Sequence, residues 1–185
     1  MRQEELEEQG KSKSTAKEVL DWILYIGIVL ILSWLIVTFV GVRTVVDGQS
    51  MEPTLQDGNN LIVDKLSYRF RDPKRYEIIV FPYKYEENTY YIKRIIGLPG
   101  ETVEIRNGSI YINGSEEPLE DVETKEPMEG SFGPYTVPED CYFVMGDNRN
   151  NSRDSRYWEH TFVTRDEILG KAVFRYWPLN KMKFL

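Results

Sequence analysis

The sequence is poor in the residues that build disulfides, zinc sites and histidine-based catalysis. Cys141 and His160 are the single cysteine and the single histidine among 185 residues. One cysteine cannot form an internal disulfide, and one residue of each kind supplies too few ligands for a Cys/His zinc site. We therefore expect neither a metal nor another cofactor.

The sequence also has no excess of positive charge, since 23 Lys and Arg residues stand against 30 Asp and Glu residues. The formal net charge is -7 at pH 7, and no basic patch laced with aromatic residues stands out in the sequence. Nucleic-acid binding proteins usually carry such a patch, because phosphate contacts dominate their affinity. The composition therefore argues against a nucleic-acid partner.

Charged residues are absent altogether from Trp22 to Val42. About 21 helical residues at ~1.5 Å per residue span roughly 30 Å, which is the thickness of a bilayer core. A core helix of that length normally keeps one polar face, and a cleavable secretory signal has a shorter apolar region of about 7–15 residues. The run predicts an uncleaved transmembrane anchor over residues 19–42, placed in the lipid bilayer of the cell membrane.

The flanking cations predict the orientation of this anchor. Lys11, Lys13 and Lys17 precede it, whereas Arg43 is the only cation that follows it before Lys65. The positive-inside rule then places residues 1–18 in the cytoplasm and residues 43–185 outside it. The polar tail 1–18 is expected to be disordered.

Residues 43–185 contain many short apolar runs separated by turn residues, which favours a mainly β domain. The hairpin at 103–112 is the clearest, because Asn107-Gly108 suits the positive φ angles of a type I′ turn. An acidic, Pro- and Gly-rich irregular insertion follows, so that hairpin and insertion occupy about 101–138. A short helix is expected at 165–169. The other predicted strands are 61–63, 77–81, 90–97, 141–145 and 172–177.

Ser50 lies a few residues after the predicted anchor, between Gly48 and Pro53. Pro53 fixes its own φ and disfavours a helical Glu52, so Ser50 is expected on a loop. A serine in such a stretch usually serves turn formation. It becomes a candidate nucleophile only if a base lies nearby.

Lys93 and Arg94 interrupt an apolar strand. Because side chains alternate along a strand, burial of either face desolvates one of these cations. Arginine keeps its proton, but a buried lysine can lose it and act as a general base. Lowering a lysine pKa from ~10.4 to ~7–8 requires about 3 units, or ~4 kcal/mol. The alternative is an edge strand with two exposed cations that prevent aggregation.

A dense polar loop, Gly146 to Arg156, follows the predicted strand 141–145. It does not fit a calcium loop, because Arg149 occupies a ligand position and no glycine stands sixth. Its Asp, Asn, Ser and Arg residues suit a loop locked by side-chain hydrogen bonds and Asp/Arg pairs. Such a loop can be purely structural, or it can orient a neighbouring base.

Together the three stretches resemble the bacterial type I signal peptidase (leader peptidase) family, in particular its compact Gram-positive-type members. The resemblance covers residues 19–178 and is carried by the motifs Ser50-Met51-Glu52-Pro53-Thr54-Leu55, Tyr91-Ile92-Lys93-Arg94-Ile95-Ile96-Gly97-Leu98-Pro99-Gly100 and Gly146-Asp147-Asn148-Arg149 with Ser152, Asp154, Ser155 and Arg156.

The resemblance implies a domain of antiparallel β-sheets and a membrane-bound serine endopeptidase that removes signal peptides from exported preproteins. It makes Ser50 the nucleophile and Lys93 the general base. Ser152 would orient Lys93, and Asp154 and Arg156 would form a supporting buried pair.

The resemblance also implies a binding site for the end of the signal peptide. The oxyanion would be held by the Ser50 N–H, while Gly48 stands where some relatives carry a hydroxyl donor, which leaves the second donor open. An extended substrate would add as a strand, with small side chains in shallow apolar pockets. The residues expected to form this site are Val46, Asp47, Gly48, Met51, Leu55, Tyr91 and Ile92.

Two alternatives remain open. A Ser-His-Asp hydrolase would have to use His160, but Glu52 stands where a Gly-x-Ser-x-Gly elbow needs glycine. A tethered, inactive relative that assembles surface proteins would share the fold, although such a protein usually lacks one residue of the dyad and both Ser50 and Lys93 are present. A Ser-x-x-Lys acyl enzyme is excluded because Pro53 occupies the lysine position.

Overall fold

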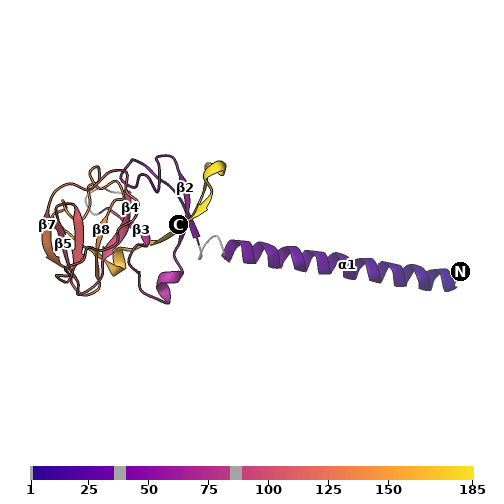
Figure 1. Cartoon of the computed structure of the whole chain (residues 1–185). Helices are drawn as coiled ribbons and strands as arrows, with labels where there is room; N and C mark the ends of the chain where they lie inside the picture. The colour runs from indigo at the N-terminus through magenta and orange to yellow at the C-terminus, as the bar shows by residue number, and fades with distance from the viewer. Residues whose placement is uncertain (1, 36–40, 84–88) are drawn as a thin grey trace. The chain divides into compact units, whose positions relative to one another are not determined.

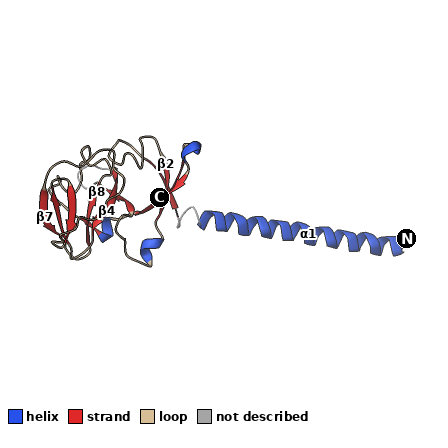
Figure 2. Ribbon diagram, viewed as in Figure 1, coloured by secondary structure: helices blue, strands red, loops and turns tan. Residues whose placement is uncertain are grey.

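A computed structural model describes residues 2–35, 41–83 and 89–185 of the chain. It divides into two compact units, residues 1–40 and residues 41–185 (Figure 1). The first unit contains the helix α1, Arg2–Leu35. The second is built from strands and loops, and its helical parts are single short turns (Figure 2).

The described part of residues 41–185 contains eleven strands and three short 3-10 helices. The strands are β1 (Gly41–Val45), β2 (Asn60–Asp64), β3 (Ile78–Pro82), β4 (Tyr90–Gly97), β5 (Thr102–Arg106), β6 (Ser109–Ile112), β7 (Phe132–Thr136), β8 (Cys141–Met145), β9 (Val163–Thr164), β10 (Gly170–Trp177) and β11 (Lys183–Phe184). The helical turns are η2 (Ser67–Arg69), η3 (Arg165–Glu167) and η4 (Leu179–Lys181).

The strands form two antiparallel sheets. In the larger sheet the order is β1-β2-β10-β3-β4-β8-β9, with β11 paired to β10, and in the smaller one it is β6-β5-β7. The β5–β6 hairpin closes through Asn107 and Gly108, whose φ angles of 48° and 80° match the predicted type I′ turn. The mainly β prediction is therefore confirmed.

Strand β4 contributes to three hydrophobic cores because its side chains alternate between the two faces of the large sheet. Ile92 packs in a core with Met51 and Leu55. Ile95 packs in a second core, and Ile96 joins a third that the small sheet covers. Burial on both faces places the central residues of β4 out of water.

Four strands were not predicted: β1, β7 and the two-residue strands β9 and β11. β1 pairs with β2 and includes Gly41 and Val42, so these residues are extended and do not belong to the predicted anchor. β7 lies inside the insertion predicted to be irregular and pairs with β5. Its Gly133-Pro134 argues against a strand in sequence, but an edge strand of a sheet tolerates proline.

The first unit also differs from its prediction. Residues 2–18, expected to be disordered, belong to α1, and their Glu, Lys, Gln and Ala residues are good helix formers. Across the ranges that the structure describes, no helix is both long and apolar enough to cross a bilayer. Residues 36–40 of the predicted anchor lie outside the described ranges.

Candidate active site

Ser50 lies on a loop between β1 and β2, as predicted, and hydrophobic anchors hold that loop. The side chains of Met51 and Leu55 are fully buried, and the Leu55 N–H donates to the Met51 carbonyl at 2.8 Å. From the polar loop, the Asn148 N–H donates to the Ser50 carbonyl at 3.0 Å and the Asn148 Nδ2 to the Gln49 carbonyl at 3.1 Å. The backbone on both sides of Ser50 is thereby fixed.

Lys93 projects from β4 towards this loop. Its Nζ lies 2.7 Å from Ser50 Oγ and 3.2 Å from its neighbour's carbonyl, that of Ile92. The residue is only 4% exposed. Burial lowers the pKa of Lys93 to about 8, against the opposing effect of the Asp154 and Asp147 carboxylates. An amine of that pKa is partly neutral near pH 7–8 and can accept a proton.

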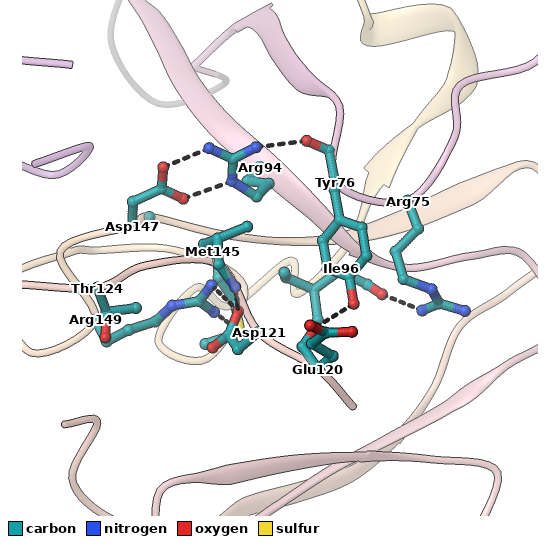
Figure 3. A network of polar contacts seen from close by, with 12 residues as sticks. Arg75, Tyr76, Arg94, Ile96, Glu120, Asp121, Thr124, Met145, Asp147 and Arg149 are labelled. Atoms are coloured by element: carbon teal, nitrogen blue, oxygen red, sulfur yellow. Dashed lines mark hydrogen bonds and ion pairs between the residues drawn. The ribbon is translucent and has the colours of Figure 1, made fainter. Parts of the chain in front are cut away.

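Arg94 is also buried, so the alternative of two exposed cations on an edge strand is wrong. Its guanidinium donates to both carboxylate oxygens of Asp147, at 2.8 and 2.6 Å (Figure 3). A third donor, Nη1, reaches the Tyr76 carbonyl at 2.6 Å. The sequence pattern alone did not pair Arg94 with Asp147, which lies 53 positions away.

The second Asp/Arg pair is the predicted one. Arg156 Nε and Nη2 donate to the Asp154 carboxylate at 2.8 and 2.9 Å, and both side chains are buried. Two backbone groups also donate to Asp154, the Gly146 N–H at 3.0 Å and the Arg156 N–H at 3.3 Å. Gly146 itself must be small, because a Cβ there would overlap the Ser50 carbonyl oxygen and Ser152 Oγ. The polar loop therefore packs directly against the loop that carries Ser50, residues 46–59, which we call the nucleophile loop.

Ser152 does not make the hydrogen bond to Lys93 that was expected of it. Its Oγ is buried, but it has no hydrogen-bond partner among the described residues, so the predicted bond to Lys93 is not formed. Ser152 nevertheless lines the same cavity as Lys93 and Ser50. A buried hydroxyl at this position remains able to accept or donate when the dyad changes its protonation state.

A cavity of about 710 Å³ opens over the Ser50–Lys93 pair. Of the residues expected to bind substrate, Val46, Asp47, Gly48, Met51, Tyr91 and Ile92 line it, whereas Leu55 is buried in the core beneath the loop. Tyr90, the first residue of the strand edge expected to pair with the substrate, also lines it, whereas the sequence did not predict the lining contributed by Val45, Gln49, Asn150, Asn151, Arg153 and Tyr157. Those from the polar loop could be found only once its packing against β4 was known.

The cavity borders an open strand edge. β3 pairs with β4 over Tyr90–Arg94, but in the described sheet β8 pairs with β4 only from Arg94 to Gly97. The pairing with β8 therefore does not extend to the stretch Tyr90 to Lys93, which lies beside the cavity. An extended peptide can add at such an edge.

Two further predicted features have definite places. Gly48 has φ +92°, and its N–H donates to Asp57 Oδ1 at 2.9 Å, so this N–H is already engaged. His160 lines a different cavity, of about 330 Å³, together with Phe81 and Trp158. The Ser50 cavity does not include His160, which gives a Ser-His mechanism no geometric support.

The known proteins that this chain resembles in sequence are signal peptidases. The family described as "Signal peptidase, peptidase S26" matches residues 19–177. A signal peptidase I of Leptolyngbya laminosa is 43% identical over 89% of this chain and 82% of its own length. One of Bacillus amyloliquefaciens is 43% identical over 96% of this chain and 97% of its own. A crystal structure of a signal peptidase I from Enterococcus faecalis is 37% identical, with TM-score 0.46, covering 56% of this chain and 98% of that one.

The family match and the two relatives, together with a mainly β fold and a serine in an open cleft, define the class of protein as a serine endopeptidase. The chain belongs to the signal peptidase (peptidase S26) family.

Proposed function

We propose that this chain cleaves N-terminal signal peptides from exported preproteins, with Ser50 as nucleophile and Lys93 as general base. The observation that carries this proposal is the 2.7 Å approach of Lys93 Nζ to Ser50 Oγ at a lysine that is 4% exposed. Burial, which lowers the pKa of Lys93, is what allows a lysine to do this work near neutral pH.

The acylation half of the proposed reaction has two proton transfers. Neutral Lys93 takes the Ser50 hydroxyl proton as Oγ attacks the scissile carbonyl, and the resulting ammonium then protonates the leaving amine. Water hydrolyses the acyl-enzyme, with Lys93 again as the base. The Ser50 N–H would donate to the oxyanion, and the Gly48 N–H would not, because it already donates to Asp57.

The proposed substrate is an extended peptide that ends in a small-x-small motif. It would pair with the part of β4 that lines the cavity beyond the end of the β8 pairing, at Tyr90–Ile92, and with residues 47–48 of the same cavity. Val46, Met51, Tyr91 and Ile92 would form the apolar wall that accepts small side chains. Backbone pairing suits many different signal sequences, because it does not depend on side-chain identity.

We further propose that residues 19–42, shortened to end before β1 at Gly41, anchor the enzyme in the cell membrane. The uncharged run from Trp22 supports this, and the cations Lys11, Lys13 and Lys17 favour a cytoplasmic N-terminus. Residues 41–185 would then act outside the cytoplasm, where exported preproteins present their cleavage sites.

The test is cleavage of a model preprotein in detergent by the wild type and the variants Ser50→Ala, Lys93→Ala and His160→Ala. We expect activity to fall by on the order of 10³-fold or more without Ser50 or Lys93, because no other group replaces nucleophile or base. His160→Ala should retain activity. Cleavage that survives Ser50→Ala or Lys93→Ala would exclude the dyad, and a wild type that binds but never cuts would indicate the inactive, tethered relative.

A further inference from the structure

Residues 119–129, which we call the strap, are part of the insertion between β6 and β7. The Leu119 N–H donates to the Ile110 carbonyl at 2.7 Å, which fixes the beginning of the strap to the β5–β6 hairpin. Met128 is 8% exposed and packs in the core that the small sheet covers. At the far end the Gly108 N–H donates to the Gly130 carbonyl at 3.0 Å. The strap is therefore fixed to the small sheet at both ends.

The strap contacts the polar loop through a buried charge. Asp121 Oδ1 accepts a hydrogen bond from Arg149 Nη2 at 2.7 Å (Figure 3). The Arg149 side chain is 0% exposed, and within the described residues Asp121 is the acid at ion-pair distance from it. A buried guanidinium cannot lose its proton, so its position depends on this carboxylate.

Arg149 in turn belongs to the backbone that fixes Ser50. Its carbonyl accepts from Arg156 Nη2 at 2.6 Å, and the residue before it, Asn148, donates to the Ser50 carbonyl. Asn150, the residue after it, exchanges two hydrogen bonds with the strap: its Nδ2 donates to the Pro127 carbonyl at 3.0 Å, and its Oδ1 accepts from the Glu129 N–H at 2.9 Å. Three consecutive residues thus connect the strap to the nucleophile loop.

The strap also reaches the nucleophile loop directly. Lys125 Nζ lies 2.9 Å from Glu52 Oε2, and Glu52 follows Ser50 by two positions. The Lys125 side chain is 56% exposed and that of Glu52 is 19% exposed. An ion pair this open to water contributes little to stability, so its loss should leave the melting temperature nearly unchanged.

A third contact connects the strap to β4, the strand that carries Lys93. The Tyr76 hydroxyl donates to the Glu120 carbonyl, and the Tyr76 carbonyl accepts from Arg94 (Figure 3). Arg94 is the neighbour of Lys93 on β4. The strap therefore contacts the immediate support of the nucleophile, of the base and of the polar loop.

We propose that the strap positions Ser50 against Lys93, with Asp121 and Lys125 as positioning residues that act through Arg149 and Glu52. Neither residue touches the reacting atoms. Their substitution changes the distance and angle at which Ser50 Oγ meets Lys93 Nζ, and therefore the rate of the chemical step more than the affinity for substrate. This inference rests on the function proposed above.

The experiment compares kcat and KM of the full-length wild type, Asp121→Asn and Lys125→Glu on one peptide substrate, together with the melting temperature of each. Asp121→Asn keeps a hydrogen-bond acceptor and removes the charge, which limits the risk of unfolding. We expect kcat to fall on the order of 10-fold in each variant with KM nearly unchanged, because small misplacements of a reacting group reduce kcat strongly. Lys125→Glu should do so without lowering Tm.

Two matched variants separate positioning from loss of charge. Glu123→Gln removes an exposed acid of the same strap that makes no hydrogen bond or ion pair with the described residues, and it should leave kcat unchanged. The double variant Lys125→Glu/Glu52→Lys reverses the ion pair and should recover most of the kcat lost in Lys125→Glu.

The outcomes distinguish this proposal from the function on which it rests. An active wild type with normal kcat in Asp121→Asn and Lys125→Glu would overturn the positioning role alone. A fall in kcat explained by a lower folded fraction, or a charge reversal that recovers nothing, would overturn it as well. An inactive wild type would overturn the proposed function and the positioning role together.

Discussion

At the scale of single residues, the two Asp/Arg pairs are important for the charge of Lys93. The Asp154 and Asp147 carboxylates favour the charged form of Lys93 and oppose the effect of burial. Each of them, however, is held by its own arginine, Arg156 or Arg94, through two hydrogen bonds. Because these carboxylates are neutralised locally, burial has the larger effect and the amine can be neutral near its working pH.

The pH dependence of activity follows from this arrangement. Burial lowers the pKa of Lys93 to about 8, and only the neutral amine can take the Ser50 proton. We therefore expect kcat/KM to rise with pH up to about 8 and to stay constant above it. The measurement is kcat/KM on a peptide without ionisable groups near its scissile bond, with a matched stability profile. A profile that is flat across this range, or that falls with rising pH, would contradict a lysine base.

At the scale of elements, β4 and the polar loop form the site because each approaches the nucleophile loop closely. β4 supplies Lys93, whose side chain is buried. The stretch Tyr90 to Lys93 lines the cavity, because the pairing of β4 with β8 begins only at Arg94. The polar loop begins at Gly146, where the absence of a Cβ allows contact with the Ser50 carbonyl and Ser152. Close backbone approach is a common reason for a glycine at the end of a strand.

Gly146→Ala tests this packing. The added methyl group would force the nucleophile loop and the polar loop apart, so we expect a loss of about 1–3 kcal/mol of stability and on the order of 10²-fold in kcat. Thermal unfolding and peptide cleavage measure the two effects. Gly27→Ala is the control, because a Cβ at Gly27 in α1 meets no atom within 4 Å. A Gly146→Ala enzyme with wild-type activity would show that the close contact is not needed.

At the scale of the whole molecule, the chain separates into a helical unit and a β unit. All the residues of the three hydrophobic cores lie between Val46 and Leu185, so the β unit carries its own core. The described residues that line the cavity over Ser50 likewise belong to that unit. Under the proposed function, residues 1–40 contribute location and not chemistry.

A protein of residues 41–185 should therefore fold and cleave a short soluble peptide at a rate similar to that of the full chain. Towards a preprotein embedded in vesicles we expect a loss on the order of 10²-fold, because anchoring raises the effective concentration of enzyme at the membrane. Cleavage assays with both substrates, and flotation of each protein with vesicles, check this. Equal activity of both proteins on the embedded substrate would argue against an anchoring role for residues 19–40.

Local patterns in the sequence were sufficient for most of the elements near the site. The strand at 90–97, the strand at 141–145 and the Asn107-Gly108 hairpin are where periodicity and turn residues predict them. The motifs around Ser50, Lys93 and Asp154 also resemble those of the family. The strands and the hairpin are determined by neighbours along the chain, which is why sequence alone reveals them, whereas the family was indicated by resemblance.

The tertiary structure decided what depends on residues far apart in the sequence. Ser50 and Lys93 are 43 positions apart, and only the packing of β4 against the nucleophile loop brings them together and buries the lysine. The same holds for the Arg94–Asp147 pair, for β7 on the edge of the small sheet, and for the strap that joins Asp121 to Arg149. Local composition predicts turns and strands, but desolvation and ion pairing depend on the neighbours that the folded chain provides.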